Sequence, residues 1–272
     1  MEMAGAEPAI FLTVIDTHCH LDAAEFGDRQ ADLAQAAIEA GVQQFVVPSV
    51  GCGNFAAVAA LCRVQPRCAP AYGIHPLYAA GVGAADFSLL GEYLARPDTV
   101  AVGEIGLDGT LDEAAVAEQE ACFIAQLKLA REQALPVLLH IRQAQDWVLK
   151  CLRRYPVRGG IAHAFNGSRQ QAEAFIALGF KLGFGGALTY SRATRLHELA
   201  RTLPLSSLVL ETDAPDIPPA FLERGQPNEP RYLPRIAAIL AELRGLPLNE
   251  LLAATRANTY AVLPRLPRID PP

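Results

Sequence analysis

Seven side chains that commonly bind metal ions fall at or just beyond the ends of short apolar segments. They include five of the six histidines of the chain, and only His197 lies outside this pattern. The seven residues are His18, His20, His75, Glu104, His140, His163 and Asp213. Imidazole nitrogens and carboxylate oxygens together suit a borderline or hard divalent cation. The residue types therefore predict a metal centre, provided that the fold brings the segment ends together.

Spacing divides these residues into two groups. His18 and His20 are two residues apart on a predicted strand, so both rings point to one face and can hold one ion. His140 and His163 come from neighbouring predicted strands and can hold a second ion. Glu104 has two oxygens with which to bridge the pair. Two ions about 3.5–4 Å apart activate a water and neutralise charge in a displacement at phosphorus or carbonyl carbon.

Short apolar runs alternate with amphipathic stretches along the whole chain, which is typical of a parallel sheet covered by helices. The predicted strands are residues 11–18, 44–50, 69–74, 100–105, 136–141, 159–165, 181–185 and 207–211. Helical spacing predicts helices over residues 113–133, 235–243 and 248–263. Eight strand–helix units in 272 residues predict an α/β protein. We expect a single (β/α)8 TIM-like barrel with its active site at the C-terminal ends of the strands.

The same patterns predict three parts along the chain. Residues 1–10 form a flexible N-terminus, residues 11–263 the barrel domain, and residues 264–272 a proline-rich C-terminal tail. Four of the last nine residues are proline, so we expect this tail to be extended or frayed.

Composition limits the function classes. Hydrophobic residues make up 51% of the chain and charged residues 19%, which excludes a disordered protein. A net charge of −6 argues against a broad basic surface that coats duplex nucleic acid. No window approaches 18 apolar residues, and the first ten residues lack the features of a secretory signal. We therefore expect a cytoplasmic protein that does not enter a membrane.

With these residues identified, the chain resembles the TatD family of metal-dependent deoxyribonucleases from Ile15 to about Leu263. The motifs that carry the resemblance are Asp16-Thr-His-Cys-His-Leu-Asp22, Gly73-Ile-His-Pro76, Gly103-Glu-Ile-Gly-Leu-Asp108, Gln126-Leu-Lys-Leu-Ala130, His140-Ile-Arg142, Glu211-Thr-Asp-Ala-Pro215 and Asn228-Glu-Pro230. Together these motifs are specific to the family, whereas a histidine pair alone would not be.

The resemblance implies a TIM-like barrel with a two-metal centre. His18, His20 and Asp213 would hold one ion, His140 and His163 the other, and Glu104 would be shared. Two divalent ions per chain are expected, Mg²⁺ or Mn²⁺ for activity, with Zn²⁺ as an alternative. Family members hydrolyse phosphodiesters, typically releasing nucleotides from the 3′ end of single-stranded DNA or RNA. The expected partner is thus a strand end or a small phosphodiester, bound by a monomer.

The chain departs from the family pattern on loops around the predicted mouth of the barrel. The departures are Gly109, Gln143, Asp216 and the Phe165-Asn166-Gly167 segment. None is a predicted metal ligand, so they bear on the choice of substrate rather than on metal binding.

Four further roles follow from these assignments. Asp213 is the expected proton acceptor from the attacking water. Arg142 follows His140 on the same strand face and could pair with a phosphate oxygen or form a salt bridge at the rim. His75 could donate a hydrogen bond to the phosphate or the leaving group, or fix the turn before Pro76. Asn166 could contact the phosphate from its loop.

Two other classes of function remain open from the sequence. Nitrogen and oxygen ligands do not choose between phosphoryl and carbonyl chemistry, so an amide, ester or lactone hydrolase on the same barrel is the alternative. The only lysines are Lys128, Lys150 and Lys181, and none lies at a catalytic strand end, which argues against the close amidohydrolase relatives with a carboxylated lysine. A non-catalytic binding protein would be expected to have lost ligands, and none is lost.

Overall fold

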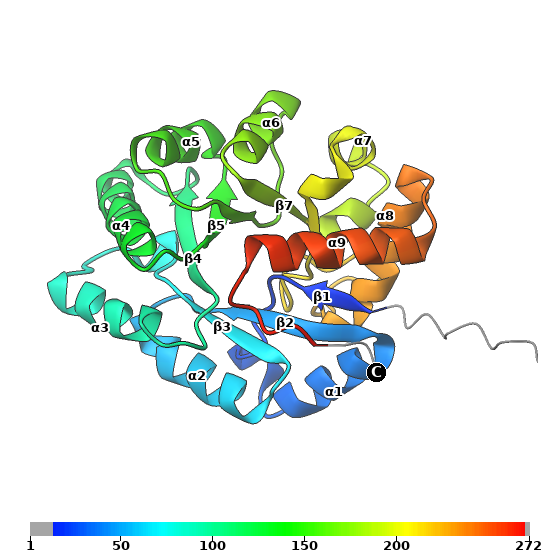
Figure 1. Cartoon of the computed structure of the whole chain (residues 1–272), viewed down its shortest axis with the longest axis horizontal. Helices are drawn as coiled ribbons and strands as arrows, with labels where there is room; N and C mark the ends of the chain where they lie inside the picture. The colour runs from blue at the N-terminus through cyan, green and yellow to red at the C-terminus, as the bar shows by residue number, and fades with distance from the viewer. Residues whose placement is uncertain (1–12, 270–272) are drawn as a thin grey trace, which may run out of the picture.

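Eight parallel strands form one sheet in the order β1 to β8 in a computed structural model that describes residues 13–269 (Figure 1). The strands are β1 Val14–Asp16, β2 Val42–Pro48, β3 Cys68–Tyr72, β4 Ala101–Asp108, β5 Val137–Arg142, β6 Gly160–Ala162, β7 Phe180–Phe184 and β8 Leu208–Leu210. The backbone N–H of Thr17 donates to the Leu210 carbonyl at 3.0 Å, which brings β1 beside β8. The predicted (β/α)8 barrel is thereby confirmed, and each predicted strand overlaps an observed one.

Helices α1 to α8 surround the sheet, and α9 lies across one end of the barrel (Figure 1). They are α1 Gln30–Ala40, α2 Phe55–Val64, α3 Ala84–Leu94, α4 Glu113–Glu132, α5 Gln145–Arg154, α6 Arg169–Ala177, α7 Thr194–Thr202, α8 Leu233–Arg244 and α9 Leu248–Val262. Local signals set several ends: Ser168 accepts the Gln171 N–H at the start of α6, and Gly41 ends α1 with a φ of 109°. Among the helices of the described residues, none is long and apolar enough to cross a membrane.

One local expectation was wrong. His18 and His20 do not lie on a strand, because β1 ends at Asp16. The Asp16 carboxylate accepts the backbone N–H of His18 at 3.3 Å, and the Cys19 N–H donates to the carbonyl of Val46 on β2 at 3.1 Å. The two histidines therefore follow the strand in an irregular segment. Residues 11 and 12 of this predicted strand, and the predicted flexible N-terminus at 1–10, lie outside the described residues.

The interior of the barrel is apolar below the strand ends. Its buried residues, Ile15, Val46, Ala71, Leu138, Ile161 and Val209, form a cluster separate from the one between sheet and helices. Val262, Leu263 and Leu266, at and beyond the end of α9, join this inner cluster. The Gln44 side chain also donates to the Pro267 carbonyl at 2.8 Å. Residues 264–269 of the predicted tail thus pack against the barrel, and residues 270–272 lie outside the described part.

Candidate metal centre

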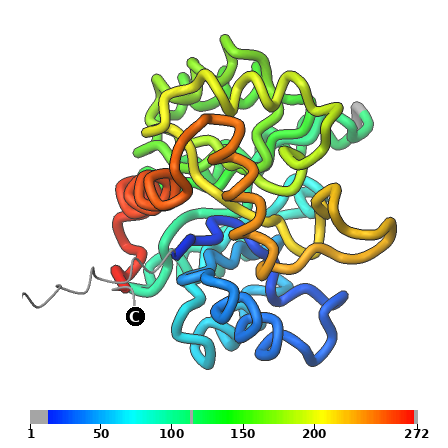
Figure 2. The backbone as a smooth tube through the Cα atoms, turned by 90° about the vertical axis from the view of Figure 1, so that its right-hand side faces the viewer, coloured from blue at the N-terminus to red at the C-terminus, as the bar shows by residue number. Residues whose placement is uncertain are grey.

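A cleft of about 1300 Å³ opens at the C-terminal ends of the strands. Figure 2 shows α9 and the C-terminal segment at one end of the barrel, and the connection that follows β8 at the other. Six carboxylates and four imidazoles line the cleft. Arg142 and Arg195 are the only cationic side chains in its walls among residues 13–269. The cleft is therefore acidic and can stabilise positive charge.

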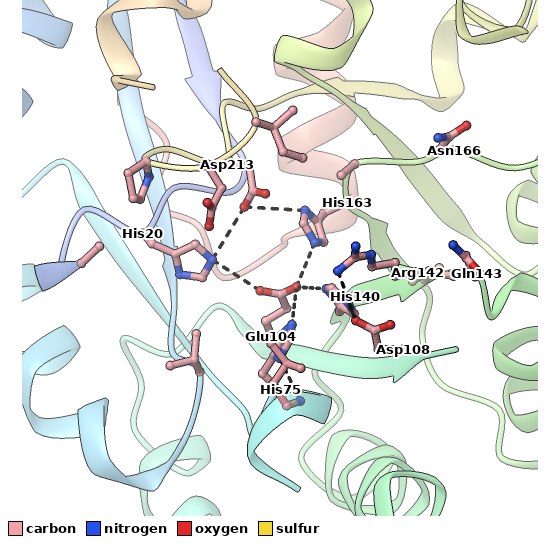
Figure 3. Close-up of a pocket in the computed structure, with 18 of the residues that line it drawn as sticks. His20, His75, Glu104, Asp108, His140, Arg142, Gln143, His163, Asn166 and Asp213 are labelled. Carbon is pink, nitrogen blue, oxygen red and sulfur yellow. Dashed lines mark hydrogen bonds and ion pairs between the residues drawn. The ribbon is translucent and has the colours of Figure 1, made fainter. Parts of the chain in front are cut away.

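Glu104, on β4, lies at the centre of the cluster with histidines around both of its oxygens (Figure 3). Its Oε2 is 3.2 Å from His18 Nε2 and 3.4 Å from His20 Nε2. Its Oε1 is 2.8 Å from His163 Nε2 and 3.0 Å from His140 Nδ1. The side chain is only 3% exposed. Each oxygen of this carboxylate thus faces two imidazoles, and the rings of His18 and His163 stack with their centroids 3.9 Å apart.

The first group contains His18, His20 and Asp213. The Nε2 atoms of His18 and His20 are 3.2 Å apart, and Asp213 Oδ1 lies 3.5 Å from the first and 3.7 Å from the second. Two imidazole nitrogens aimed at each other need a shared proton or a shared cation between them. The donor set of two nitrogens and one carboxylate oxygen fits a divalent cation.

The second group faces the other oxygen of Glu104 and contains His140 and His163, with His75 beside them. His75 Nε2 is 3.7 Å from Glu104 Oε1. Donor atoms in the cluster also lie within 4.8 Å of one another in three sets: His18 with Glu104 and His163; His18 with His20 and Asp213; and His75 with Glu104 and His140. The residues present therefore fit a divalent ion, and Glu104 is common to two of the sets.

Asp108, which the sequence reasoning did not select, holds His140 in place. Its Oδ2 is 3.3 Å from His140 Nε2, and its Oδ1 accepts the backbone N–H and the hydroxyl of Thr110 at 2.9 and 2.6 Å. With a divalent ion bound, the His140 Nε2–H would point to Asp108 and leave the Nδ1 lone pair for the ion. A carboxylate that orients a histidine in this way commonly supports a metal ligand.

Two further buried carboxylates support the cluster from behind. Glu211 accepts the backbone N–H of Ala164, and its Oε1 lies 3.8 Å from His163 Nδ1. Asp16 accepts the backbone N–H of Thr212 at 3.0 Å and the Thr212 hydroxyl at 2.6 Å. Both residues stand in the motifs quoted above. The sequence analysis instead predicted their neighbours His18, His163 and Asp213 as metal ligands. A sequence pattern alone does not distinguish metal ligands from the residues that position them.

Glycines and left-handed residues shape the backbone around the ligands. A Cβ on Gly183 would overlap the Glu211 carboxylate, so only glycine leaves room for that side chain. Ala164, directly after His163, has a φ of 43°, and Asp213 itself has a φ of 59°. Non-glycine residues rarely adopt this left-handed conformation, and it is typical of strained functional sites. The backbone conformation at both positions is thus set by the site.

Opposing charges dominate the electrostatics of the cluster. Burial alone would raise the pKa of Glu104, but the charges of His163 and His18 and the hydrogen bonds to His140 and His163 together hold this pKa well below its usual range. Burial alone would lower the pKa of His163, but Glu104 and Asp213 raise it to about 10. In the same way the pKa of His20 rises to about 9 against its burial. The carboxylates thus stabilise positive charge, which protons on imidazoles or a divalent cation that displaces them can supply.

The structure brings the six predicted ligands together. Figure 3 shows five of them, with the three predicted substrate contacts at different distances from the cluster. His75 lies within the cluster. Arg142 lies at the rim with a side chain 65% exposed and its Nη1 4.0 Å from Asp108 Oδ2. Asn166 lies farther out, where its Oδ1 accepts a hydrogen bond from Arg195 at 2.7 Å.

The barrel and the histidine–carboxylate cluster at its mouth define a metal-dependent barrel hydrolase. The sequence profile described as TatD related DNase matches residues 15–264. The chain belongs to this family.

Two relatives and one solved structure show the extent of the likeness. The uncharacterized metal-dependent hydrolase YjjV of Escherichia coli K12 is 43% identical over 252 residues, covering 91% of this chain and 96% of that protein. A 3′-5′ ssDNA/RNA exonuclease TatD of Escherichia fergusonii is 32% identical over 251 residues, covering 90% and 96%. The crystal structure of YjjV, a TatD homologue from Escherichia coli K12, superposes with a TM-score of 0.89 at 41% identity, covering 94% of this chain and 99% of that one.

Proposed function

We propose that this protein is a two-metal phosphodiesterase that removes nucleotides from the 3′ end of single-stranded DNA or RNA. The observation that carries the proposal is the position of Glu104 between two groups of metal-binding side chains at the floor of a cleft. Family membership supports it, since relatives about a third identical are named 3′-5′ ssDNA/RNA exonucleases.

In this proposal His18, His20 and Asp213 hold one divalent ion, and His140 and His163 hold the other, with Glu104 shared. When bound, the two ions supply an acidified water and positive charge beside the scissile phosphate. Asp213 is the proton acceptor, because its Oδ1 lies beside histidines of both groups, 3.5 Å from His18 Nε2 and 4.0 Å from His163 Nδ1. The water oxygen bonds to phosphorus and gives its proton to Asp213, the bond from phosphorus to the 3′ oxygen of the shortened strand breaks, and that oxygen takes up a proton to become a hydroxyl group.

His75 serves this reaction as a fixed hydrogen-bond donor rather than as a ligand. Its Nδ1 accepts the backbone N–H of Leu77 at 3.1 Å, so the ring is neutral and carries its hydrogen on Nε2. This Nε2–H points toward Glu104 Oε1, 3.7 Å away. A phosphate oxygen seated beside Glu104 would accept it. Arg142, exposed at the rim, would pair with a phosphate of the same strand.

The charge of the cleft favours a strand end over a duplex. Six carboxylates against two guanidiniums leave few partners for phosphates beyond the bound ions. A protein that coats a duplex neutralises many phosphates with lysine and arginine. We therefore expect the cleft to hold one strand end and two or three phosphates.

A substrate panel tests the proposal. The metal-loaded protein is given single-stranded DNA and RNA labelled at the 5′ end, and a nitrophenyl ester. We expect a ladder of strands shortened from the 3′ end and no comparable ester hydrolysis. Ester hydrolysis without strand shortening would overturn the proposal in favour of the carbonyl hydrolase. The Glu92→Ala variant, changed at an exposed residue of α3, serves as the control with unaltered activity.

A further inference from the structure

Two large apolar side chains stand exposed at the edge of the cleft. Among the described residues, only Val64, Leu77, Tyr78 and Leu89 are large hydrophobics with substantial exposure. Leu77 and Tyr78 are consecutive, each is 57% exposed, and both line the cleft. Adjacent exposed apolar side chains at the edge of a binding cleft are typical of a ligand contact.

The segment that carries Tyr78 is held rigidly. It is a short 3₁₀ helix, Pro76–Tyr78, directly after His75. Before it, the Gln126 amide accepts the backbone N–H of Ile74 at 2.7 Å and donates to the Ile74 carbonyl at 2.9 Å. The Tyr78 N–H donates to the His75 carbonyl at 2.8 Å. A tyrosine on such a segment presents its ring without a large loss of conformational freedom on binding.

The Tyr78 ring neighbours His75, which belongs to the cluster. Its centroid is 6.4 Å from that of His75, whose Nε2 is in turn 3.7 Å from Glu104 Oε1. In a nucleotide, one sugar separates the base from its phosphate. A phosphate beside Glu104 would therefore place a neighbouring base at the Tyr78 ring.

Charge decides which base this is. The two cationic side chains of the cleft, Arg142 and Arg195, come from β5 and α7, whereas Tyr78 follows β3. The other phosphates of a bound strand require positively charged side chains, so they would lie on the side of Arg142 and Arg195. The 3′-terminal nucleotide has no further phosphate beyond the scissile one, so it suits the apolar side.

Resting on the proposed function, we propose that Tyr78, extended by Leu77, forms a stacking site for the 3′-terminal nucleobase. The remaining strand leaves the cleft past Arg142 and Arg195. Because every base presents an aromatic face, this site recognises the presence of a base rather than its identity.

The test compares two single strands that differ only in the last nucleotide, which is either normal or an abasic analogue. For the wild-type protein, kcat/KM should be roughly 5- to 150-fold lower for the abasic end, the range typical of base–aromatic stacking. For Tyr78→Ala the two strands should be cleaved at similar rates. Tyr78→Phe should restore the difference, since the ring is retained, and Val64→Ala is the matched control at an exposed apolar residue outside the cleft.

Two other outcomes overturn the inference in distinguishable ways. An equal preference for the normal end in wild type and Tyr78→Ala removes the stacking site and leaves the exonuclease proposal standing. Failure of the metal-loaded wild type to shorten either strand removes both proposals together.

Discussion

The two ends of the barrel are built from the same strands with opposite chemistry. On β5, Leu138 packs in the apolar interior, and two residues later His140 faces Glu104. On β6, Ile161 is apolar and His163 follows just beyond the strand end. The inner end buries hydrocarbon, which stabilises the fold, whereas the outer end buries ionisable groups that are costly to desolvate. The barrel thus separates the residues that stabilise it from those that act, as this fold generally does.

The largest expected effect is on activity and comes from the outer end of the barrel, which carries the histidine–carboxylate cluster. Glu104→Ala removes the side chain between the two ligand groups, so we expect turnover to fall by at least about 10³-fold. The fold should remain intact, because Glu104 lies in the cleft at the mouth of the barrel and not in its packed apolar interior. Activity assays and thermal unfolding check both parts. If Glu104→Ala unfolded the protein while Glu92→Ala did not, the separation of the two ends would be refuted.

Asp213→Asn sharpens the same point by keeping the shape of the side chain. The amide cannot accept a proton, so turnover should be lost while the free energy of unfolding stays near that of the wild type. Near-normal rates with metal still bound would show that Asp213 is not the proton acceptor. Metal content, measured by elemental analysis of the variant, separates this result from simple loss of an ion.

The next effect belongs to the inner end. Leu138 is fully buried, so Leu138→Ala should lower the free energy of unfolding by about 2–5 kcal/mol. Activity per folded molecule should change little, since the side chain does not line the cleft. Denaturant titration and rate measurements on the native fraction give the two values. Leu89→Ala, at a residue 36% exposed, is the control with a small effect. A large fall in the activity per folded molecule of Leu138→Ala would contradict the separation of the two ends.

The sequence was most informative at the points where each apolar strand is followed by polar residues. Buried parallel strands have near-continuous apolar runs, so the position of each strand, and of the polar residues that follow it, could be predicted. The roles of Asp16, Asp108 and Glu211 could not. Their hydrogen bonds reach residues on other elements, from Asp16 to Thr212 and from Glu211 to Ala164. Such contacts depend on the register of strands that are distant in sequence.

The outward position of Asn166 has the same origin. The sequence places it three residues after His163, near enough to expect a phosphate contact. In the folded chain Arg195 donates to its side chain and Gln145 donates to its carbonyl at 2.9 Å, both from helices of the outer ring. Loop residues follow contacts with neighbouring elements, which spacing along the chain does not encode.

A smaller effect concerns the residues that support the outer end. Asp108→Asn keeps the size of the side chain but removes the charge that orients His140. Loss of such a supporting carboxylate typically weakens metal binding by about 10- to 100-fold. Calorimetric titration with Mn²⁺ should show this loss in one of the two sites, with Asp98→Asn, an exposed residue, unchanged. Equal weakening of both sites would contradict the assignment of His140 to one ion.

The smallest effect tests how the acidic mouth holds a strand. With two or three phosphates gripped, the slope of log affinity against log salt should be about −0.7 per contact, on the order of −2. Binding is measured with a strand whose last linkage resists hydrolysis. The protein should also spare a covalently closed single-stranded circle, because a circle offers no end to enter a cleft lined by six carboxylates. A slope steeper than about −5 would mean that many phosphates are neutralised, which Arg142 and Arg195 alone cannot do. Rapid cutting of the circle would likewise place the bound strand across the mouth rather than end-on within it.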